Sequence, residues 1–268
     1  MKIIDAHVHI YPDKIAQKAS QSISDFYNLD AAYDGKVSTL NEACELAGVS
    51  QCLVHSVATN PSQVGSINSF IRKTAMQHPR KFFGFATVHP LAKDIEFQIE
   101  NAVAAGLSGF KLHPDFQKFF ADGHEAMQTF EIIDGRLPVL IHAGDNRKPY
   151  SGPERILKLC KAFPNQTVIA AHFGGWSQWG KQAKELSSLG LYVDTSSSQA
   201  FISPEKIREL IDIFTSERVL FGTDYPIWNI KNEIEMLNRI LRDATEAEKI
   251  YHLNFEKLMS ESNNKAIR

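Results

Sequence analysis

The chain has 268 residues, and 43% of them are hydrophobic, which suffices for a sizeable globular core. It carries 29 Lys and Arg against 31 Asp and Glu, a net charge of -2. This balance excludes a broadly basic protein that would bind nucleic acid or a membrane surface through its overall charge. No apolar run approaches the roughly 20 residues that span a bilayer, and polar residues interrupt the N-terminal stretch, so we expect neither a membrane segment nor a signal peptide. The three cysteines show no C-x-x-C spacing and predict reduced thiols in a cytoplasmic protein.

Strand-like apolar runs, most of them rich in Val, Ile, Leu and Phe, recur along the chain. Such continuous apolar character is typical of parallel strands that are covered on both faces. Segments with the helical spacing of apolar residues separate the runs, for example at Val64, Ile67 and Ile71. The eight runs are residues 2–10, 51–59, 82–90, 107–114, 137–145, 166–175, 191–198 and 218–226.

Eight strands that alternate with eight helices predict an α/β fold of the (β/α)8 type, a TIM barrel, and the length suits one. No linker or shift in composition divides the chain, so we expect a single domain over residues 1–268. An open doubly wound sheet is the alternative, but no G-x-G-x-x-G follows the first strand. Residues 11–37 form a long insertion between the first strand and its helix, and residues 115–123 a shorter one. Barrel loops of such length often cover the active site, so the first insertion predicts a lid.

The first run carries Asp5, His7 and His9 at alternate positions. Because side chains alternate along a strand, we expect these three to share one face and Ile4, Ala6, Val8 and Ile10 to share the other. A strand with its polar face in water is the simplest alternative, because H-x-H is a short motif.

Polar residues also stand at the ends of several later runs, where the active site of a barrel lies. Burying a polar group without a partner costs roughly 2 kcal/mol or more, and a shared divalent metal satisfies several such groups at once. Imidazole and carboxylate ligands suit Zn²⁺, with Mn²⁺, Fe²⁺ or Co²⁺ as alternatives. The candidates are His7, His9, Lys111, His113, His142, His172 and Asp224.

Four of these segments, DAHVHI, LIHAGD, AAHFGG and LFGTDYP, resemble in the same order the motifs of the amidohydrolase superfamily. The resemblance is closer to its amidohydrolase-related group of hydrolases and non-oxidative decarboxylases, and it extends from residue 3 to about residue 259. It implies that His7, His9 and His142 are metal ligands and that Asp224 is a ligand or the base for the metal-activated water. It also implies a catalytic role for His172, which would polarise a carbonyl or move a proton.

The number of metal ions that the resemblance implies depends on the state of Lys111. Members with two metals usually carry a carboxylated Lys or a Glu on the fourth strand, and Lys111 lies in that run. Lys111 can instead be an ordinary ammonium that holds an acidic substrate. We predict one ion per chain, with Lys111, His113 and Trp176 in contact with the substrate. His55 and His89 also end strands, but they fall outside the motifs, and we predict satisfied histidines at the rim.

The leading hypothesis is a metal-dependent hydrolase that uses metal-activated water on a small-molecule amide, ester or lactone. The same site could act as a lyase that releases CO₂ from an aromatic or muconate-type acid. A TatD-type deoxyribonuclease is less favoured, because it would normally carry Glu where Lys111 stands. A barrel that has lost catalysis and only binds a ligand is also less favoured, because the full set of predicted metal ligands is present. We therefore expect a small-molecule substrate and neither nucleic acid nor membrane as a partner, and we leave a homo-oligomer open.

Overall fold

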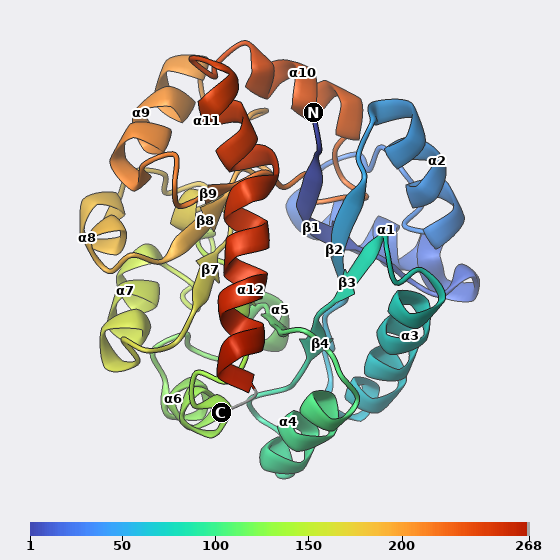
Figure 1. Ribbon diagram of the computed structural model, residues 1–268. Helices are drawn as coiled ribbons and strands as arrows, with labels where there is room; N and C mark the ends of the chain where they lie inside the picture. Colours follow the sequence, from blue (N-terminus) through green and yellow to red (C-terminus); the bar gives the residue numbers. More distant parts are fainter. Residues whose placement is uncertain (267–268) are drawn as a thin grey trace.

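The computed structural model describes residues 1–266, and it has an α/β fold in which a ring of short parallel strands is surrounded by helices (Figure 1). The last two residues of the predicted domain, 267–268, lie outside the described part. The strands pair in the order β1-β2-β3 and β4-β5-β6-β7-β8-β9. They are β1 Ile4–His9, β2 Gln51–His55, β3 Phe82–Gly84, β4 Ala86–Thr87, β5 Phe110–Leu112, β6 Val139–Ile141, β7 Val168–Ala170, β8 Tyr192–Asp194 and β9 Val219–Leu220.

The predicted strand at 82–90 is divided into β3 and β4, with Phe85 between them. The Phe85 N–H donates to the carbonyl oxygen of Val54 on the β2 side at 3.0 Å. The Ala86 N–H donates to the carbonyl oxygen of Gly109 on the β5 side at 2.8 Å. Residues 82–90 therefore join the two groups of strands, and β3 and β4 together take one position in the ring.

Backbone hydrogen bonds also connect the first strand to the last. The Ala6 N–H donates to the carbonyl oxygen of Phe221 at 2.8 Å, and the Asp224 N–H donates to the carbonyl oxygen of His7 at 2.9 Å. β1 thus pairs with the segment that follows β9. Neighbouring strands are linked all the way around, as the predicted (β/α)8 barrel requires.

Helices surround the ring, and most of them pack their apolar sides against its outside, where most of the core lies. The long ones are α1 Asp13–Tyr27, α2 Val37–Ala47, α3 Val64–Gln77, α4 Ile95–Ala104, α6 His124–Ile133, α7 Pro153–Ala162, α9 Pro204–Phe214, α10 Ile230–Asn238 and α12 Asn254–Ala266. The short ones are α5 Pro114–Gln117, α8 Ala183–Ser188 and α11 Ala244–Glu248, with 3₁₀ turns at Pro61–Gln63 and His172–Gly174 and a π-helical turn at Lys249–Leu253.

A second, smaller cluster of apolar side chains fills the ring and is closed by α12. Ile4, at the start of β1, packs there with Phe255, Leu258 and Met259 of α12. Figure 1 shows α12 lying across this end of the strands. Because α12 covers the end where the strands begin, any accessible site must lie at the opposite end, where they finish.

The prediction that Asp5, His7 and His9 share one face of β1 was wrong for Asp5. The pairing of β1 with β2 is irregular between Asp5 and Val8, so the alternation of side chains is interrupted there. The Asp5 carboxylate accepts hydrogen bonds from the backbone N–H and the hydroxyl of Thr223, at 3.0 and 2.5 Å. Asp5 therefore ties β1 to the segment after β9, while His7 and His9 turn to the site.

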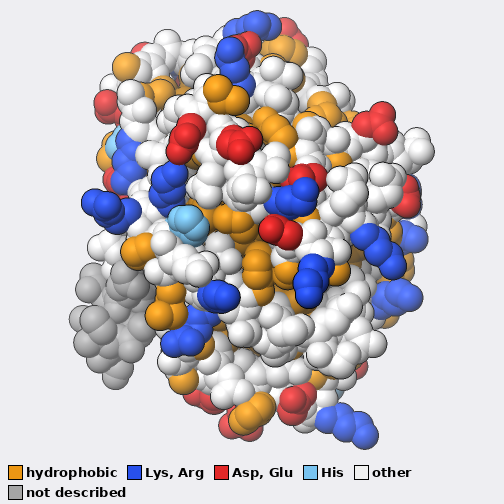
Figure 2. Space-filling model, turned by 90° about the vertical axis from the view of Figure 1, so that its right-hand side faces the viewer, with side chains coloured by type: hydrophobic (Ala, Val, Ile, Leu, Met, Phe, Trp, Pro, Cys, Tyr) orange, Lys and Arg blue, Asp and Glu red, His pale blue; other side chains and the backbone are white. Residues whose placement is uncertain are grey.

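The surface shows no gathering of one charge on the face displayed in Figure 2, where acidic, basic and apolar side chains are interspersed. Within the described residues, no helix is long and apolar enough to cross a membrane. Cys44, Cys52 and Cys160 are free and buried.

Candidate metal centre

The predicted site residues meet at the end of the barrel opposite α12. All of them are buried except Asp224, which is half-buried. They are His7 and His9 on β1, Lys111 on β5, His113 after β5, His142 after β6, His172 and Trp176 after β7, and Asp224 after β9.

His7 lies at the centre of the group and is held in one tautomer. Its Nδ1 lies 2.9 Å from a carboxylate oxygen of Asp194, which can only accept, so Nδ1 carries the proton. The Nε2 atom is therefore the lone-pair atom, and it accepts a hydrogen bond from Lys111. It lies 3.0 Å from the Nζ of Lys111 and 3.4 Å from the Oδ1 of Asp224. A histidine oriented by a carboxylate in this way is the usual arrangement around a metal ligand.

Asp194, the last residue of β8, organises this part of the site. Besides His7, its carboxylate accepts from the backbone N–H of His172 at 3.0 Å and from the N–H and hydroxyl of Ser196. Burial would raise the pKa of Asp194, but the charge interaction with His7 and these hydrogen bonds hold it below its usual value. No motif marks this aspartate, and its only signal in the sequence is its place at the end of a strand.

Asp224 faces both histidines of β1. Its Oδ1 lies 3.4 Å from the Nε2 of His7 and 3.4 Å from the Nε2 of His9, while the Ser197 hydroxyl donates to its Oδ2 at 2.5 Å. The backbone of Asp224 is left-handed, with φ 62°, which is uncommon for a residue other than glycine. Burial would raise its pKa, but His7 and His9 outweigh burial and keep the pKa well below the usual value, so the carboxylate stays ionised.

His142 and His172 form a second pair whose tautomers follow from their neighbours. The Nδ1 of His172 lies 2.9 Å from the carbonyl oxygen of Ser196 and must donate to it. Its Nε2 then accepts from the Nδ1–H of His142 at 3.0 Å. This leaves the Nε2 of His142 as a lone-pair atom without a hydrogen-bond partner, 3.4 Å from the Oδ2 of Asp115.

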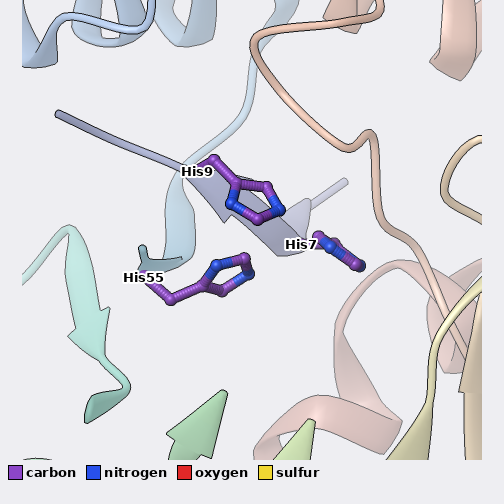
Figure 3. A group of neighbouring side chains, drawn as sticks. All are labelled: His7, His9 and His55. Atoms are coloured by element: carbon purple, nitrogen blue, oxygen red, sulfur yellow. The ribbon is translucent and has the colours of Figure 1, made fainter. Parts of the chain in front are cut away.

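His55, at the end of β2, was predicted to be a satisfied rim histidine, but the structure places it against His7 and His9. Figure 3 shows the three imidazoles together, two from β1 and one from β2. The ring centroids of His55 and His9 are 4.4 Å apart, and those of His55 and His7 are 5.0 Å apart. Both nitrogens of His55 are buried without a hydrogen-bond partner, as is the Nδ1 of His9.

These unpartnered donors fit a divalent cation. Burial lowers the pKa of His7, His9, His55 and His142, to about 4 for His7, so the imidazoles are neutral and can offer lone pairs. A buried nitrogen without a partner is costly, and a cation would satisfy several of them. Three sets of ligand atoms lie within 4.8 Å of one another: His7, His9 and His55; His7, His172 and Asp194; and His113, Asp115 and His142.

Lys111 is fully buried beside His7, where burial lowers its pKa to about 8. His113 stacks on His142 with ring centroids 3.9 Å apart, and its Nε2 lies 3.1 Å from the hydroxyl of Tyr27. Both nitrogens of His113 are occupied, because its Nδ1 accepts from the backbone N–H of Phe116. His113 is thus better placed to support His142 than to bind an ion.

The insertion between β1 and α2 contains α1, whose C-terminal end covers the site. Tyr27 contacts Trp176 with ring centroids 5.0 Å apart, and the guanidinium of Arg147 lies over both rings. Beneath them, a hollow of about 10 Å³ is lined by residues that include Tyr27, His142, His172, Trp176, Ser197 and Asp224. The site therefore joins predicted metal ligands and the predicted catalytic histidine around one small polar space.

The sequence from residue 4 to residue 259 matches the family model described as amidohydrolase. The chain belongs to the amidohydrolase family. An enzyme of this family depends on a metal, and the donor set above is suited to one. No curated protein matches the sequence.

Solved structures with the same fold include members whose names give different activities. An uncharacterized TIM-barrel protein from Bordetella bronchiseptica is 20% identical, with a TM-score of 0.80, and the match covers 98% of this chain and 100% of that one. A dihydroxybenzoic acid decarboxylase from Polaromonas, solved with manganese, is 14% identical, with a TM-score of 0.74 and 97% of each chain covered. A probable 2-pyrone-4,6-dicarboxylic acid hydrolase from Acinetobacter baumannii is 17% identical, with a TM-score of 0.70 and coverage of 97% and 100%. At these identities the likeness shows the fold, and this amidohydrolase-family enzyme is a hydrolase or a decarboxylase.

Proposed function

We propose that this enzyme hydrolyses an amide, ester or lactone bond of a small molecule. The observation that carries the proposal is the hollow of about 10 Å³ beside His142, His172 and Asp224, since a water molecule needs a polar space of about that size. Hydrolysis consumes one water next to these residues, whereas decarboxylation requires none.

His7, His9, His142 and Asp224 would hold the cation, as one ion per chain. The imidazole and carboxylate donors suit Zn²⁺, and the manganese in the similar decarboxylase supports Mn²⁺ as an alternative. Such an ion, when bound, polarises a carbonyl oxygen and lowers the pKa of nearby water. Two lone-pair atoms support these ligands: the unpartnered Nε2 of His142, and the Nε2 of His7, whose hydrogen-bond partner is Lys111.

Asp224 and His172 would accept and transfer the proton that water loses during hydrolysis. The Ser197 hydroxyl fixes Oδ2 of Asp224, so an ionised carboxylate is held at the hollow, ready to accept a proton from water. The His172 side chain lines the same hollow, and it would transfer a proton there once the hydrogen bond from His142 to its Nε2 is released. Trp176 and Tyr27 form one wall of the hollow.

Decarboxylation is the second candidate, which the similar dihydroxybenzoic acid decarboxylase supports, and Lys111 is compatible with it. Its buried ammonium, 3.0 Å from His7 Nε2, would attract the carboxylate of an acidic substrate. Lys111 would hold a substrate carboxylate in either reaction, so it does not by itself separate the two.

A direct assay separates the two candidate reactions. Enzyme loaded with Zn²⁺ or Mn²⁺ is mixed with small esters, lactones, amides and aromatic acids, and acid release and CO₂ are both recorded. We expect acid release without CO₂ from at least one ester, lactone or amide. CO₂ from an aromatic acid, with every hydrolysis assay negative, would reject the hydrolase.

The variant His172→Asn tests the proton role. We expect it to keep most of the metal and the fold and to lose about 10²- to 10⁴-fold in turnover, as is typical for a general acid-base group. Metal content and turnover are measured on the same preparation. Loss of metal together with activity would instead make His172 a ligand.

The variant His142→Ala tests the ligand set. Titration of the wild type should saturate near one ion per chain, and His142→Ala should bind far less. Metal content equal to that of the wild type would remove His142 from the site, and two ions per wild-type chain would overturn the single-ion proposal.

The expected partner is a small molecule, which agrees with the interspersed charges of Figure 2. The three free, buried thiols support a reducing compartment such as the cytoplasm.

A further inference from the structure

A cavity of about 520 Å³ opens beside the candidate metal centre, between α1 and α3. This volume lies within the range of sites that enclose a drug-sized ligand. Its lining includes His9, one of the predicted metal ligands. The hollow beside Asp224 holds about one water and cannot hold an organic substrate, so the substrate needs space of this kind next to the site.

The helix α1 presents its apolar face to this cavity and buries its small residues elsewhere. Its buried positions are Ala16, Ser20 and Ser24, spaced by four residues. The larger apolar side chains Ile15, Ile23 and Phe26 lie on a different face and line the cavity, together with Ala19. Ile15 is 51% exposed. An amphipathic helix normally buries its large apolar side chains, so the arrangement of α1 is the reverse of the usual one.

The other walls continue this apolar surface toward the site. Ile67 and Phe70 of α3 face the cavity from the far side, and Phe116 of α5 lies near its inner end. The Phe116 ring contacts Phe26 with centroids 4.8 Å apart, and its other neighbour is His113, stacked at 3.8 Å. Phe116 therefore connects the wall of the cavity to the His113–His142 stack. Among the lining residues, Lys18 is the one lysine or arginine, and no aspartate or glutamate is present.

We propose that this cavity binds the apolar acyl part of the substrate, an uncharged aliphatic chain or aryl ring, with the bond to be cleaved toward His9. The proposal rests on the proposed hydrolase and names its substrate class. Occupation would cover the apolar face of α1 that is otherwise exposed, and each buried methylene adds to the affinity. Short acyl groups would leave most of the cavity unfilled and would be poorer substrates.

Binding of the fluorescent probe 8-anilinonaphthalene-1-sulfonate tests the cavity without any substrate. Ala19→Trp fills the cavity from α1, and Ile15→Glu places a charge in it at a position exposed enough to preserve folding. Gln17→Trp, on the exposed outer face of the same helix, is the matched control. We expect the first two variants to bind the probe at least about tenfold more weakly, and the control to bind it like the wild type. Metal content should be equal in all four proteins.

A chain-length series connects the cavity to catalysis. The wild type should prefer p-nitrophenyl octanoate to p-nitrophenyl acetate in kcat/KM, and Ala19→Trp should lose that preference. Absence of probe binding to the wild type, unchanged binding in Ala19→Trp and Ile15→Glu, or equal weakening in Gln17→Trp would overturn the proposal. If no protein hydrolysed either ester, the proposed hydrolase would be weakened, and the probe measurements would still decide the cavity.

Discussion

His7 and His142 show how neighbouring groups prepare a histidine for a metal. In each, Nδ1 carries the proton because a neighbouring acceptor requires it, Asp194 for His7 and His172 for His142. Nε2 is then the lone-pair atom, and it faces the site in both residues. Substituting Asp194 or Ser196 would remove a hydrogen bond that fixes the tautomer of a site histidine, although neither residue is a predicted metal ligand. Residues outside the motifs therefore affect the metal site.

His55 leads to a prediction at the scale of single residues. Its two nitrogens lack partners and face His7 and His9, so we expect His55→Ala to weaken metal binding about tenfold or more. His89→Ala is the control, because His89 is also buried after a strand but belongs to none of the three donor groups. Affinity is measured by competition with a chelator, and melting temperatures show whether both variants fold. Equal metal affinities in the two variants would mean that His55 is a structural residue and not part of the metal site.

At the scale of elements, the two ends of the insertion meet at Gly35, which lies between α1 and α2 and accepts a hydrogen bond from the Tyr11 N–H at 3.0 Å. Its φ of +80° is one that L side chains rarely adopt, and a Cβ there would lie 2.7 Å from the Ser20 hydroxyl and 2.8 Å from the Tyr11 ring. The close approach is possible because α1 directs small residues such as Ser20 inward. The packing of the small face thus explains how the helix can turn its large apolar side chains to the cavity.

Gly35→Ala should therefore destabilise the protein more than Gly48→Ala. Gly48 has a similar φ of +75°, but a Cβ there would meet nothing within 4 Å. Both variants carry the backbone cost of about 1 kcal/mol, and overpacking adds about 1–3 kcal/mol at Gly35 alone. Urea unfolding of the two variants and the wild type measures the difference. Equal losses would mean that α1 moves away from Gly35 at little cost.

At the scale of the whole molecule, the two ends of the barrel have different roles: one end is packed and stabilises the fold, and the other end carries the candidate site. The α12 helix closes the end where the strands begin, and the candidate site lies at the other end. The fold also buries a carboxylic acid that is not one of the predicted site residues. Glu233 of α10 is 3% exposed and accepts a hydrogen bond from the Gln199 amide at 2.7 Å. Burial raises its pKa to about 7.

This raised pKa predicts how stability changes with pH. Between about pH 4.5 and 7 the folded protein holds a proton on Glu233 that the unfolded chain has lost, so this contribution to stability falls as the pH rises and is gone above about pH 7. The loss is on the order of 3 kcal/mol. Glu233→Gln removes it, and its stability relative to the wild type should rise from pH 5 to pH 8 in urea unfolding. Glu235→Gln, exposed on the same helix, controls for the lost charge. Parallel profiles for Glu233→Gln and the wild type would refute the assignment.

The sequence by itself determined the alternation of strands and helices and the placement of His7, His9, His142, His172 and Asp224 at strand ends. Apolar runs and helical spacing are local patterns, and the barrel follows from their order because parallel strands must be covered by helices. The family motifs are local too, so the candidate ligands could be named before any contact was known. Which atoms hold the metal, and whether the reaction is hydrolysis, stay predictions.

Only the tertiary structure decided which other residues join the site. His55, Asp194 and Ser196 carry no motif, and they meet His7 because closing the ring brings separate strand ends together. The irregularity of β1, which turns Asp5 toward Thr223, depends on pairing with two neighbours and cannot be read from alternation. The sequence also could not show that the apolar face of α1 lines a cavity. Helical spacing shows which residues share a face, but it does not show which part of the protein that face contacts. The periodicity of apolar residues is a property of one segment, whereas a tertiary contact depends on two segments that can be far apart in the sequence.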